Sequence, residues 1–243
     1  MQKIHVLLKK EDLDGERLDA KVVIVLDILF ATTTMVSVLA EGAAAVLPMA
    51  DGPAALAEIA RQPAGSCLLA GELNAETLPG FLAATPANLI AEGVRGRSLV
   101  YATTNGTPAV LAARSAHAVY VAALTNAQAV VDHVVRHHPD RTVLIVCAGS
   151  AGRFNLEDFY GAGYVVSLFR AAEGRRDYTD AAIGAALVHA QGEGQPEHRH
   201  PLWLARVGRR MLAKDLEAEV RYAARKSWID LVARFDGTRV VRL

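Results

Sequence analysis

Short apolar runs alternate with helical patterns along most of the chain, and this alternation limits the possible folds more than any other feature. Runs typical of β-strands occupy 22–28, 45–49, 66–70, 98–102, 118–122 and 142–147. Helical patterns lie at 32–41, 52–61, 107–115, 126–137 and 155–172. Strands that alternate with helices favour parallel pairing, because a crossover helix returns the chain to the same end of the sheet. We therefore predict a layered α/β fold with a largely parallel sheet.

The remaining segments carry weaker signals. Residues 71–97 are rich in Gly, Pro and Asn and read as loop, and the sequence after 172 is mostly helical with a polar break at 191–200. Strand-like residues return at 229–234 and 239–242. The length of 243 residues suits one α/β domain over 1–243, or two βα-rich lobes that share a core. An Ala-Thr-Thr sequence occurs at both 31–33 and 102–104, which is a weak sign of an internal repeat.

Composition argues against several classes of partner. The chain has 26 Lys and Arg against 26 Asp and Glu, which gives no electrostatic reason to expect nucleic acid or an anionic membrane. No apolar stretch is long enough to span a bilayer, and the charged N-terminus does not resemble a signal peptide. The two cysteines, Cys67 and Cys147, suggest no disulfide framework. We expect a soluble cytoplasmic protein.

The first chemically unusual segment is "DILFATTT", where an apolar strand ends in Asp27. A carboxylate at this place suits a hard metal ion or acid–base chemistry, and hydroxyls at a helix start favour an anion such as phosphate. The hydroxyls belong to Thr32, Thr33 and Thr34. Helix capping explains the same residue types equally well.

The second segment is "ATTNGTP", in which Thr103, Thr104, Asn105 and Thr107 surround Gly106. Glycine lets the backbone approach a ligand, and polar side chains before a helix suit an anion. An Asn-Gly turn that leads into a helix is the simpler alternative.

The third segment, "CAGSAGRFNLED", places Arg153 before a helix that carries Glu157 and Asp158. Arginine suits bidentate binding of phosphate or carboxylate. Asn155 and Asp158 have the spacing of a capping box, so Asp158 has a structural alternative as well. Glu72, in "AGELN", adds another carboxylate after a strand. Ligands of open α/β sheets bind beyond the carboxyl ends of the strands, so these segments together suit Mg²⁺ and a phosphate ester.

Four motifs in fixed order carry a resemblance to a known family: Asp27-Ile-Leu-x-Ala-Thr-Thr-Thr, Gly71-Glu72, Thr103-Thr104-Asn105-Gly106-Thr107 and Cys147-Ala-Gly-x-x-Gly-Arg153-Phe-x-Leu-Glu157-Asp158. With "EVRYAARKSWIDLVARFDGTRV" near the C-terminus, they resemble the 2-phosphosulfolactate phosphatase (ComB-like) family over nearly the whole chain. The resemblance implies a layered α/β/α fold with a mixed, largely parallel sheet, a Mg²⁺-dependent phosphatase reaction and a homodimer. The family's substrate is a three-carbon acid that bears phosphate and sulfonate, on the route to coenzyme M.

Several positions depart from the pattern of this family. Phe30 and Leu73 stand where the family typically has arginine. Leu82 replaces an acid, and Ala84 and Thr85 fall where Gly-Asn is expected. Because charge-assisted hydrogen bonds contribute about 1.5–3 kcal/mol each, the loss of two arginines predicts a less anionic substrate.

The leading hypothesis is therefore a Mg²⁺-dependent phosphatase that acts on a small 2-hydroxy-acid phosphate ester. We expect Asp27, Glu72 and Asp158 to be catalytic, with Mg²⁺ on Asp27 and Glu72 and with Glu157 or Asp158 assisting. The phosphoryl group is expected to be held by Thr32, Thr33, Thr34, Thr103, Thr104, Asn105, Gly106, Thr107 and Arg153. The alternatives are a family member that binds a ligand or partner without hydrolysis, and an enzyme that eliminates phosphate.

Overall fold

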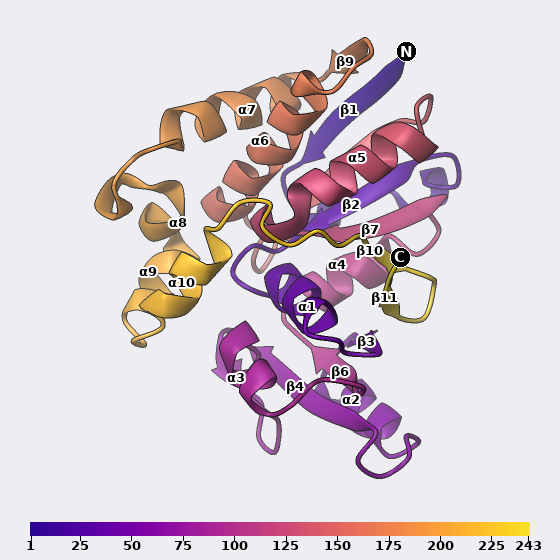
Figure 1. Ribbon diagram of the computed structural model, residues 1–243, viewed down its shortest axis with the longest axis vertical. Helices are drawn as coiled ribbons and strands as arrows, with labels where there is room; N and C mark the ends of the chain where they lie inside the picture. The colour runs from indigo at the N-terminus through magenta and orange to yellow at the C-terminus, as the bar shows by residue number, and fades with distance from the viewer.

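The computed structural model describes residues 1–243, and it contains a single eleven-stranded sheet with helices around it (Figure 1). The strands are β1 (Gln2–Leu7), β2 (Val22–Leu26), β3 (Ala45–Met49), β4 (Cys67–Leu73), β5 (Glu76–Thr77), β6 (Ser98–Ala102), β7 (Ala118–Ala122), β8 (Val143–Cys147), β9 (Arg176–Tyr178), β10 (Ala233–Phe235) and β11 (Val240–Arg242). The helices are α1 (Ala31–Ala40), α2 (Gly52–Ile59), α3 (Pro86–Ala91), α4 (Gly106–Ala112), α5 (Ala127–His137), α6 (Leu156–Ala171), α7 (Asp180–Gly192), α8 (Pro201–Leu204), α9 (Arg206–Leu212) and α10 (Glu217–Ala223). The predicted α/β class is confirmed.

The sheet consists of two parallel blocks joined by an antiparallel hairpin. Its strand order is β5-β4-β6-β3-β11-β10-β7-β2-β8-β1-β9. Strands β4, β6 and β3 run parallel to one another, as do β7, β2, β8, β1 and β9. The C-terminal hairpin β10–β11 pairs antiparallel with β7 on one side and with β3 on the other. The mixed, largely parallel sheet predicted from the family resemblance is therefore present.

Strand β2 shows how the layers form, because its side chains are buried on both faces. Val22, Ile24 and Leu26 belong to one hydrophobic cluster, which also contains apolar side chains of α5, α6 and α7. Val23 and Val25 belong to a second cluster, with apolar side chains of α1 and α4. Alternate residues of a strand point to opposite faces, so a strand covered by helices on both sides is apolar throughout. The result is the expected α/β/α layering.

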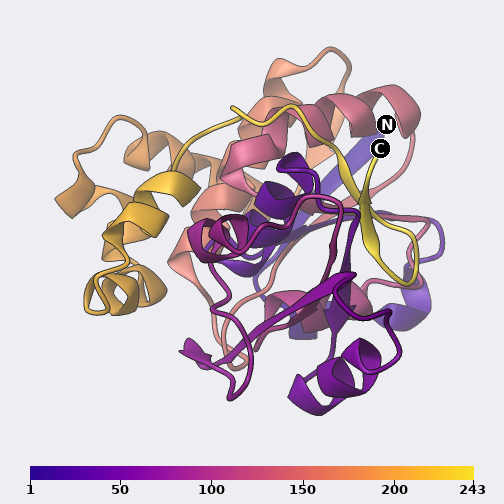
Figure 2. The same cartoon turned by 60° about the horizontal axis from the view of Figure 1, so that its bottom comes forward.

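Two crossover connections carry the chain from one block of the sheet to the other. The chain passes from β2 through α1 to β3 in the other block, and it returns from β6 through α4 to β7. The C-terminal segment then runs from α10 across the molecule to the hairpin that joins the blocks, as both views show (Figures 1 and 2). Helices α8, α9 and α10 form a separate group beside the sheet (Figure 2). No helix has the length and apolar character needed to cross a lipid bilayer.

Most predicted elements agree with the structure to within a few residues, and β3, β6 and β7 have the predicted bounds. Strands β1, β5 and β9 were not predicted, and α3 lies inside the stretch read as loop. Strand β1 was missed because its buried and exposed residues alternate within a charged segment, although it pairs with both β8 and β9.

Candidate active site

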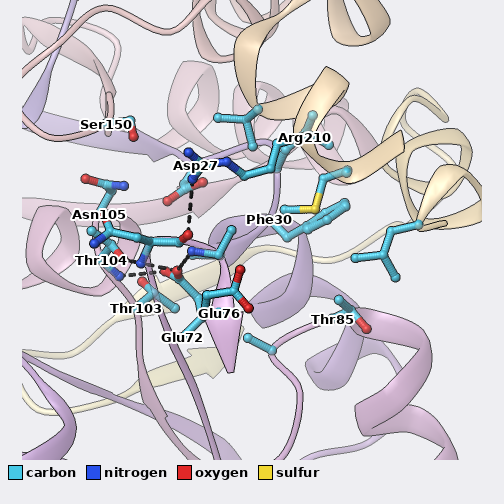
Figure 3. Close-up of a pocket in the computed structure, with 18 of the residues that line it drawn as sticks. Asp27, Phe30, Glu72, Glu76, Thr85, Thr103, Thr104, Asn105, Ser150 and Arg210 are labelled. Atoms are coloured by element: carbon cyan, nitrogen blue, oxygen red, sulfur yellow. Dashed lines mark hydrogen bonds between the residues drawn. The ribbon is translucent and has the colours of Figure 1, made fainter. Parts of the chain in front are cut away.

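A cavity of about 520 Å³ lies at the carboxyl ends of strands from both blocks. Asp27 follows β2, Glu72 is near the end of β4, Thr103 follows β6 and Ser150 lies just beyond β8. Helix α9 closes another side of the cavity and contributes Arg210. Figure 3 shows Asp27, Asn105 and Glu72 on one side, Phe30 and Thr85 on the other, and Arg210 reaching across the cavity towards Asp27. This is the expected place for a ligand in an open α/β sheet.

Asp27 is a buried carboxylate in this cavity. Burial raises its pKa well above the ordinary value, and the nearby charges of Asp158 and Glu72 raise it further. A hydrogen bond from the backbone N–H of Ala31, at the start of α1, and the charge of Lys10 act in the opposite direction. Asp27 therefore lines the cavity beside the start of α1, but it is not the N-cap of this helix, a position that Phe30 occupies.

Glu72 is held by the loop that follows β6. Its carboxylate accepts hydrogen bonds from the backbone N–H of Thr104 at 2.7 Å, the hydroxyl of Thr104 at 3.0 Å and the N–H of Ala75 at 2.6 Å. The hydroxyl of Thr104 also accepts a hydrogen bond from the N–H of Asn74 at 2.7 Å. These contacts fix the position of the Glu72 carboxylate beside Asp27.

The three threonines of the first motif have hydrogen-bond partners within the protein and do not line the cavity. The hydroxyl of Thr32 donates to the carbonyl of Asp27 at 2.9 Å and accepts from the N–H of the same residue at 2.9 Å. The hydroxyl of Thr33 donates to Ile28 at 2.8 Å, and that of Thr34 donates to Ala84 at 3.0 Å. Since a hydroxyl has one hydrogen, none of the three is free to donate to phosphate. Thr32 and Thr33 hold the turn between β2 and α1, and Thr34 joins α1 to the segment before α3.

The second motif lies partly at the cavity. Thr103, Thr104 and Asn105 line it, whereas Gly106 and Thr107 lie behind them. The hydroxyl of Thr107 accepts from the N–H of Thr103 at 2.9 Å, and that of Thr103 accepts from the N–H of Thr107 at 3.0 Å. Asn105 accepts through Oδ1 from Lys10 Nζ at 3.1 Å and from the N–H of Ala151 at 3.3 Å. Its amide NH₂ group is therefore available to a ligand.

Asp158 lies behind the cavity and connects two strand ends. Its Oδ1 accepts from the N–H of Ile28 at 2.9 Å, and its Oδ2 accepts from the N–H of Gly149 at 3.1 Å. Burial and the charge of Glu157 raise its pKa well above the ordinary value. The capping-box interpretation is wrong, because the Asn155 side chain makes no capping hydrogen bond and Asp158 binds other backbone groups.

Glu157 and Arg153 are not at the cavity. Glu157 is buried, its Oε2 atom has no hydrogen-bond partner, and burial raises its pKa to about 7. Arg153 is exposed, and its backbone pairs with Ser150. The geometry thus brings Asp27, Glu72 and the 103–105 loop together, with Asp158 in support, and leaves Arg153 and Glu157 outside.

Comparison with known proteins gives this geometry a context. A family model described as 2-phosphosulpholactate phosphatase matches residues 7–238. The chain belongs to this family. A protein of Deinococcus radiodurans named "probable 2-phosphosulfolactate phosphatase" is 39% identical over 218 residues, which cover 87% of this chain and 86% of that protein. Proteins of the same name from Symbiobacterium thermophilum and Clostridium perfringens strain SM101 are each 31% identical, over 94% and 96% of this chain and 97% and 93% of their own lengths.

Two positions at which the chain departs from the 2-phosphosulpholactate phosphatase pattern have different surroundings. Phe30 is only 8% exposed and lines the cavity. Leu73 is 57% exposed and does not line it. Of the departures from the family pattern, Phe30, Ala84 and Thr85 therefore line the cavity, whereas Leu73 and Leu82 do not.

Two cations at the cavity were missed from the sequence. Arg210 donates from its NH1 nitrogen to the carbonyl of Asn74 at 3.1 Å. Lys214 donates to the carbonyl of Ala75 at 2.7 Å and pairs with Glu76. Arg210 belongs to α9 and Lys214 to the turn after it, and no local pattern places either beside the strand ends.

The lining carboxylates of this family member fit a metal ion that is held partly by its substrate. No group of three or more His, Cys, Asp and Glu side chains is arranged to hold an ion alone. Asp27 and Glu72 nevertheless both line the cavity, and the charge of one acts on the other. Mg²⁺ is commonly bound by one or two carboxylates with waters and substrate phosphates. The pair suits that mode of binding, not a closed cage.

Proposed function

We propose that this chain is a Mg²⁺-dependent phosphatase that hydrolyses the phosphate monoester of a small 2-hydroxy acid. The observation that carries the proposal is the buried carboxylate of Asp27, which lies beside Glu72 in the cavity. None of the ion pairs in the structure includes Asp27. A buried carboxylate without a countercharge costs several kcal/mol, so this site favours a bound cation.

The chain's own residues have distinct roles in this proposal. Asp27 and Glu72 hold the ion, which would neutralise phosphoryl charge and lower the pKa of bound water. The N–H groups of Thr104 and Ala75 orient the Glu72 carboxylate. Asp158 acts as a positioning residue, because it fixes the backbone on either side of the cavity.

The phosphoryl group has two free donors within reach of the same side of the cavity. These are the amide NH₂ of Asn105 and the hydroxyl of Ser150, which makes no hydrogen bond within the chain (Figure 3). Thr103 and Thr104 line the same side but use their hydroxyls within the protein. We therefore place the phosphoryl group between Asn105, Ser150 and the carboxylates.

The substrate in this proposal differs from the phosphosulfolactate named for the relatives. Phe30 replaces a family arginine at the cavity wall, so the site presents less positive charge and more apolar surface. A less anionic hydroxy-acid phosphate suits such a wall better than one that also carries a sulfonate.

The test is release of inorganic phosphate from a panel of 2-hydroxy-acid phosphates that includes 2-phosphosulfolactate, in Mg²⁺ and in EDTA. We expect turnover that EDTA abolishes and added Mg²⁺ restores. Asp27→Asn keeps the size of the side chain and should lower the rate by at least about a hundredfold. NMR identification of the product separates hydrolysis, which gives the hydroxy acid, from elimination, which gives an unsaturated acid. Ligand binding without metal-dependent turnover would favour a non-hydrolytic family member.

We also propose that the protein is a cytoplasmic homodimer. Both cysteines are free thiols, which suits a reducing compartment. The dimer is supported by the resemblance to the family. Light scattering of the purified protein would measure its mass, and a value for a single chain would contradict the dimer.

A further inference from the structure

The cavity holds few cations that could bind the acid group of a substrate. Among Lys and Arg side chains only Arg210 and Lys214 line it, and both come from α9 and the turn after it. Lys214 is already occupied, because it pairs with Glu76 and donates to the carbonyl of Ala75. The charge that remains for a ligand is that of Arg210.

Arg210 has unused hydrogen-bonding capacity. It makes one hydrogen bond, from NH1 to the carbonyl of Asn74, and no ion pair. A guanidinium has five N–H donors in a planar fork, so at least one edge remains free for a carboxylate. Figure 3 shows the side chain extending from α9 across the cavity, with its guanidinium group towards Asp27 and the carbonyl of Asn74.

The surroundings of Arg210 select against a further anionic group. Phe30 and Met211 line the cavity and belong to the same hydrophobic cluster. Glu219, which is buried, also lines the cavity and accepts a hydrogen bond from the N–H of Ala87 at 3.2 Å. A sulfonate placed beyond Arg210 would meet apolar side chains and a carboxylate, and both disfavour it.

We propose that Arg210 is the specificity-determining residue that binds the substrate carboxylate, and that Phe30 and Met211 accept an apolar substituent on the adjacent carbon. This inference rests on the proposed phosphatase function and deepens it. The preferred substrate is then the 2-phosphate of a 2-hydroxy monocarboxylic acid with an apolar side chain. Helix α9 supplies the charge that the loop after β2 lacks.

The experiment compares three phosphate esters on the full-length protein: 2-phospho-3-phenyllactate, the same ester with methyl in place of carboxylate, and 2-phosphosulfolactate. In wild type, kcat/KM should be highest for phospho-phenyllactate. Arg210→Met should lower kcat/KM for phospho-phenyllactate by about ten- to a hundredfold. It should leave kcat/KM unchanged for the analogue in which methyl replaces the carboxylate. Arg209→Met is the matched control, because Arg209 is the neighbouring exposed arginine on α9 and does not line the cavity. Phe30→Arg should shift preference towards the sulfonate.

The assignment is overturned if Arg210→Met affects phospho-phenyllactate and its methyl analogue equally, or if Arg209→Met has the same effect as Arg210→Met. It is also overturned if wild type prefers 2-phosphosulfolactate. A second measurement, calorimetric binding of 3-phenyllactate, does not depend on turnover. Binding that Arg210→Met weakens at least tenfold would support the assignment even if no ester were hydrolysed, in which case the phosphatase proposal alone would fail. If wild type neither bound 3-phenyllactate nor hydrolysed any ester, both the phosphatase proposal and the assignment of Arg210 would be contradicted.

Discussion

Gly106 packs against Asp27 so closely that a Cβ atom at position 106 would lie 2.7 Å from Oδ2 of the aspartate. The same atom would lie 2.3 Å from Cβ of Ala31, at the start of α1. Gly106 begins α4, which follows β6 in one block of the sheet, whereas Asp27 follows β2 in the other. The glycine therefore lets the carboxyl ends of the two blocks meet around the buried carboxylate.

We predict that Gly106→Ala displaces Asp27 and impairs both folding and activity. Alanine is the better helix former, so any loss must come from the contacts with Asp27 and Ala31. We expect a stability loss of about 1–3 kcal/mol in urea and at least tenfold lower phosphate release. Gly15→Ala is the control, because a Cβ there meets nothing within 4 Å. Equal effects of the two substitutions would contradict the close-contact argument.

Thr104→Val tests the support of Glu72. The substitution keeps the shape of the side chain, but it removes the donor to Glu72 and the acceptor for the N–H of Asn74. We expect a loss of about 1–2 kcal/mol in stability. If Glu72 holds Mg²⁺, the Mg²⁺ concentration that gives half of the maximal rate should rise about ten- to a hundredfold, since groups that orient a metal ligand contribute about that much to metal affinity. Thr142→Val, at the opposite end of β8, should change neither quantity. A variant with normal stability and normal Mg²⁺ affinity would show that Glu72 needs no support from Thr104.

The buried Glu157 predicts a pH dependence of stability. Its pKa is raised to about 7 from 4.5, because burial disfavours the charged form and Oε2 has no partner. The folded state therefore holds this proton more tightly than the unfolded state does. As a result, the free energy of unfolding falls as the pH rises from about 4.5 through about 7, and above pH 7 this fall is complete.

Glu157→Gln cannot ionise, so it should flatten this part of the stability profile. We expect the fall in unfolding free energy between pH 5 and pH 8, measured in urea with EDTA, to shrink by roughly 2–3 kcal/mol relative to wild type. Glu173→Gln, at an exposed position, should leave the profile unchanged. A Glu157→Gln profile as steep as that of wild type would assign the slope to Asp27 and Asp158 instead.

The central fold was predictable because local pattern and tertiary environment agree there. Strand β2 is apolar throughout, and the structure buries it on both faces. The two Ala-Thr-Thr sequences are not structurally equivalent, since residues 31–33 begin α1, whereas Ala102 ends β6 and residues 103 and 104 follow it. The equivalent pairs are Asp27 with Thr32 and Thr103 with Thr107, in which the threonine hydroxyl binds the backbone of the earlier residue.

The site was only partly predictable, because residue type does not fix where a side chain points. Asp27 and Glu72 were found from their places after apolar strands, and both line the cavity. Thr34 has the same chemistry as a phosphate-binding threonine, but its partner, the carbonyl of Ala84, is known only from the tertiary structure. Arg210 was missed because nothing local places α9 beside the strand ends.

The packing of α6 against α7 provides a last prediction, in which two glycines should respond with opposite signs. A Cβ atom at Gly163 of α6 would lie 2.0 Å from the carbonyl oxygen of Ala185 in α7, so the helices must separate to accommodate it. A Cβ atom at Gly184 of α7 would meet only Phe159, at 3.8 Å, which is an ordinary contact.

We expect Gly163→Ala to lower stability by about 3 kcal/mol, through strain in a close-packed interface. Gly184→Ala should raise stability by about 0.5–1 kcal/mol, because alanine favours the helix. For a chain of this length the corresponding changes in Tm are about 2–4 °C per kcal/mol, and thermal unfolding followed by circular dichroism would resolve both. Destabilisation by both substitutions would mean that α7 tolerates no added methyl group on this face, whereas tolerance of Gly163→Ala would show that the two helices are not in contact at this point.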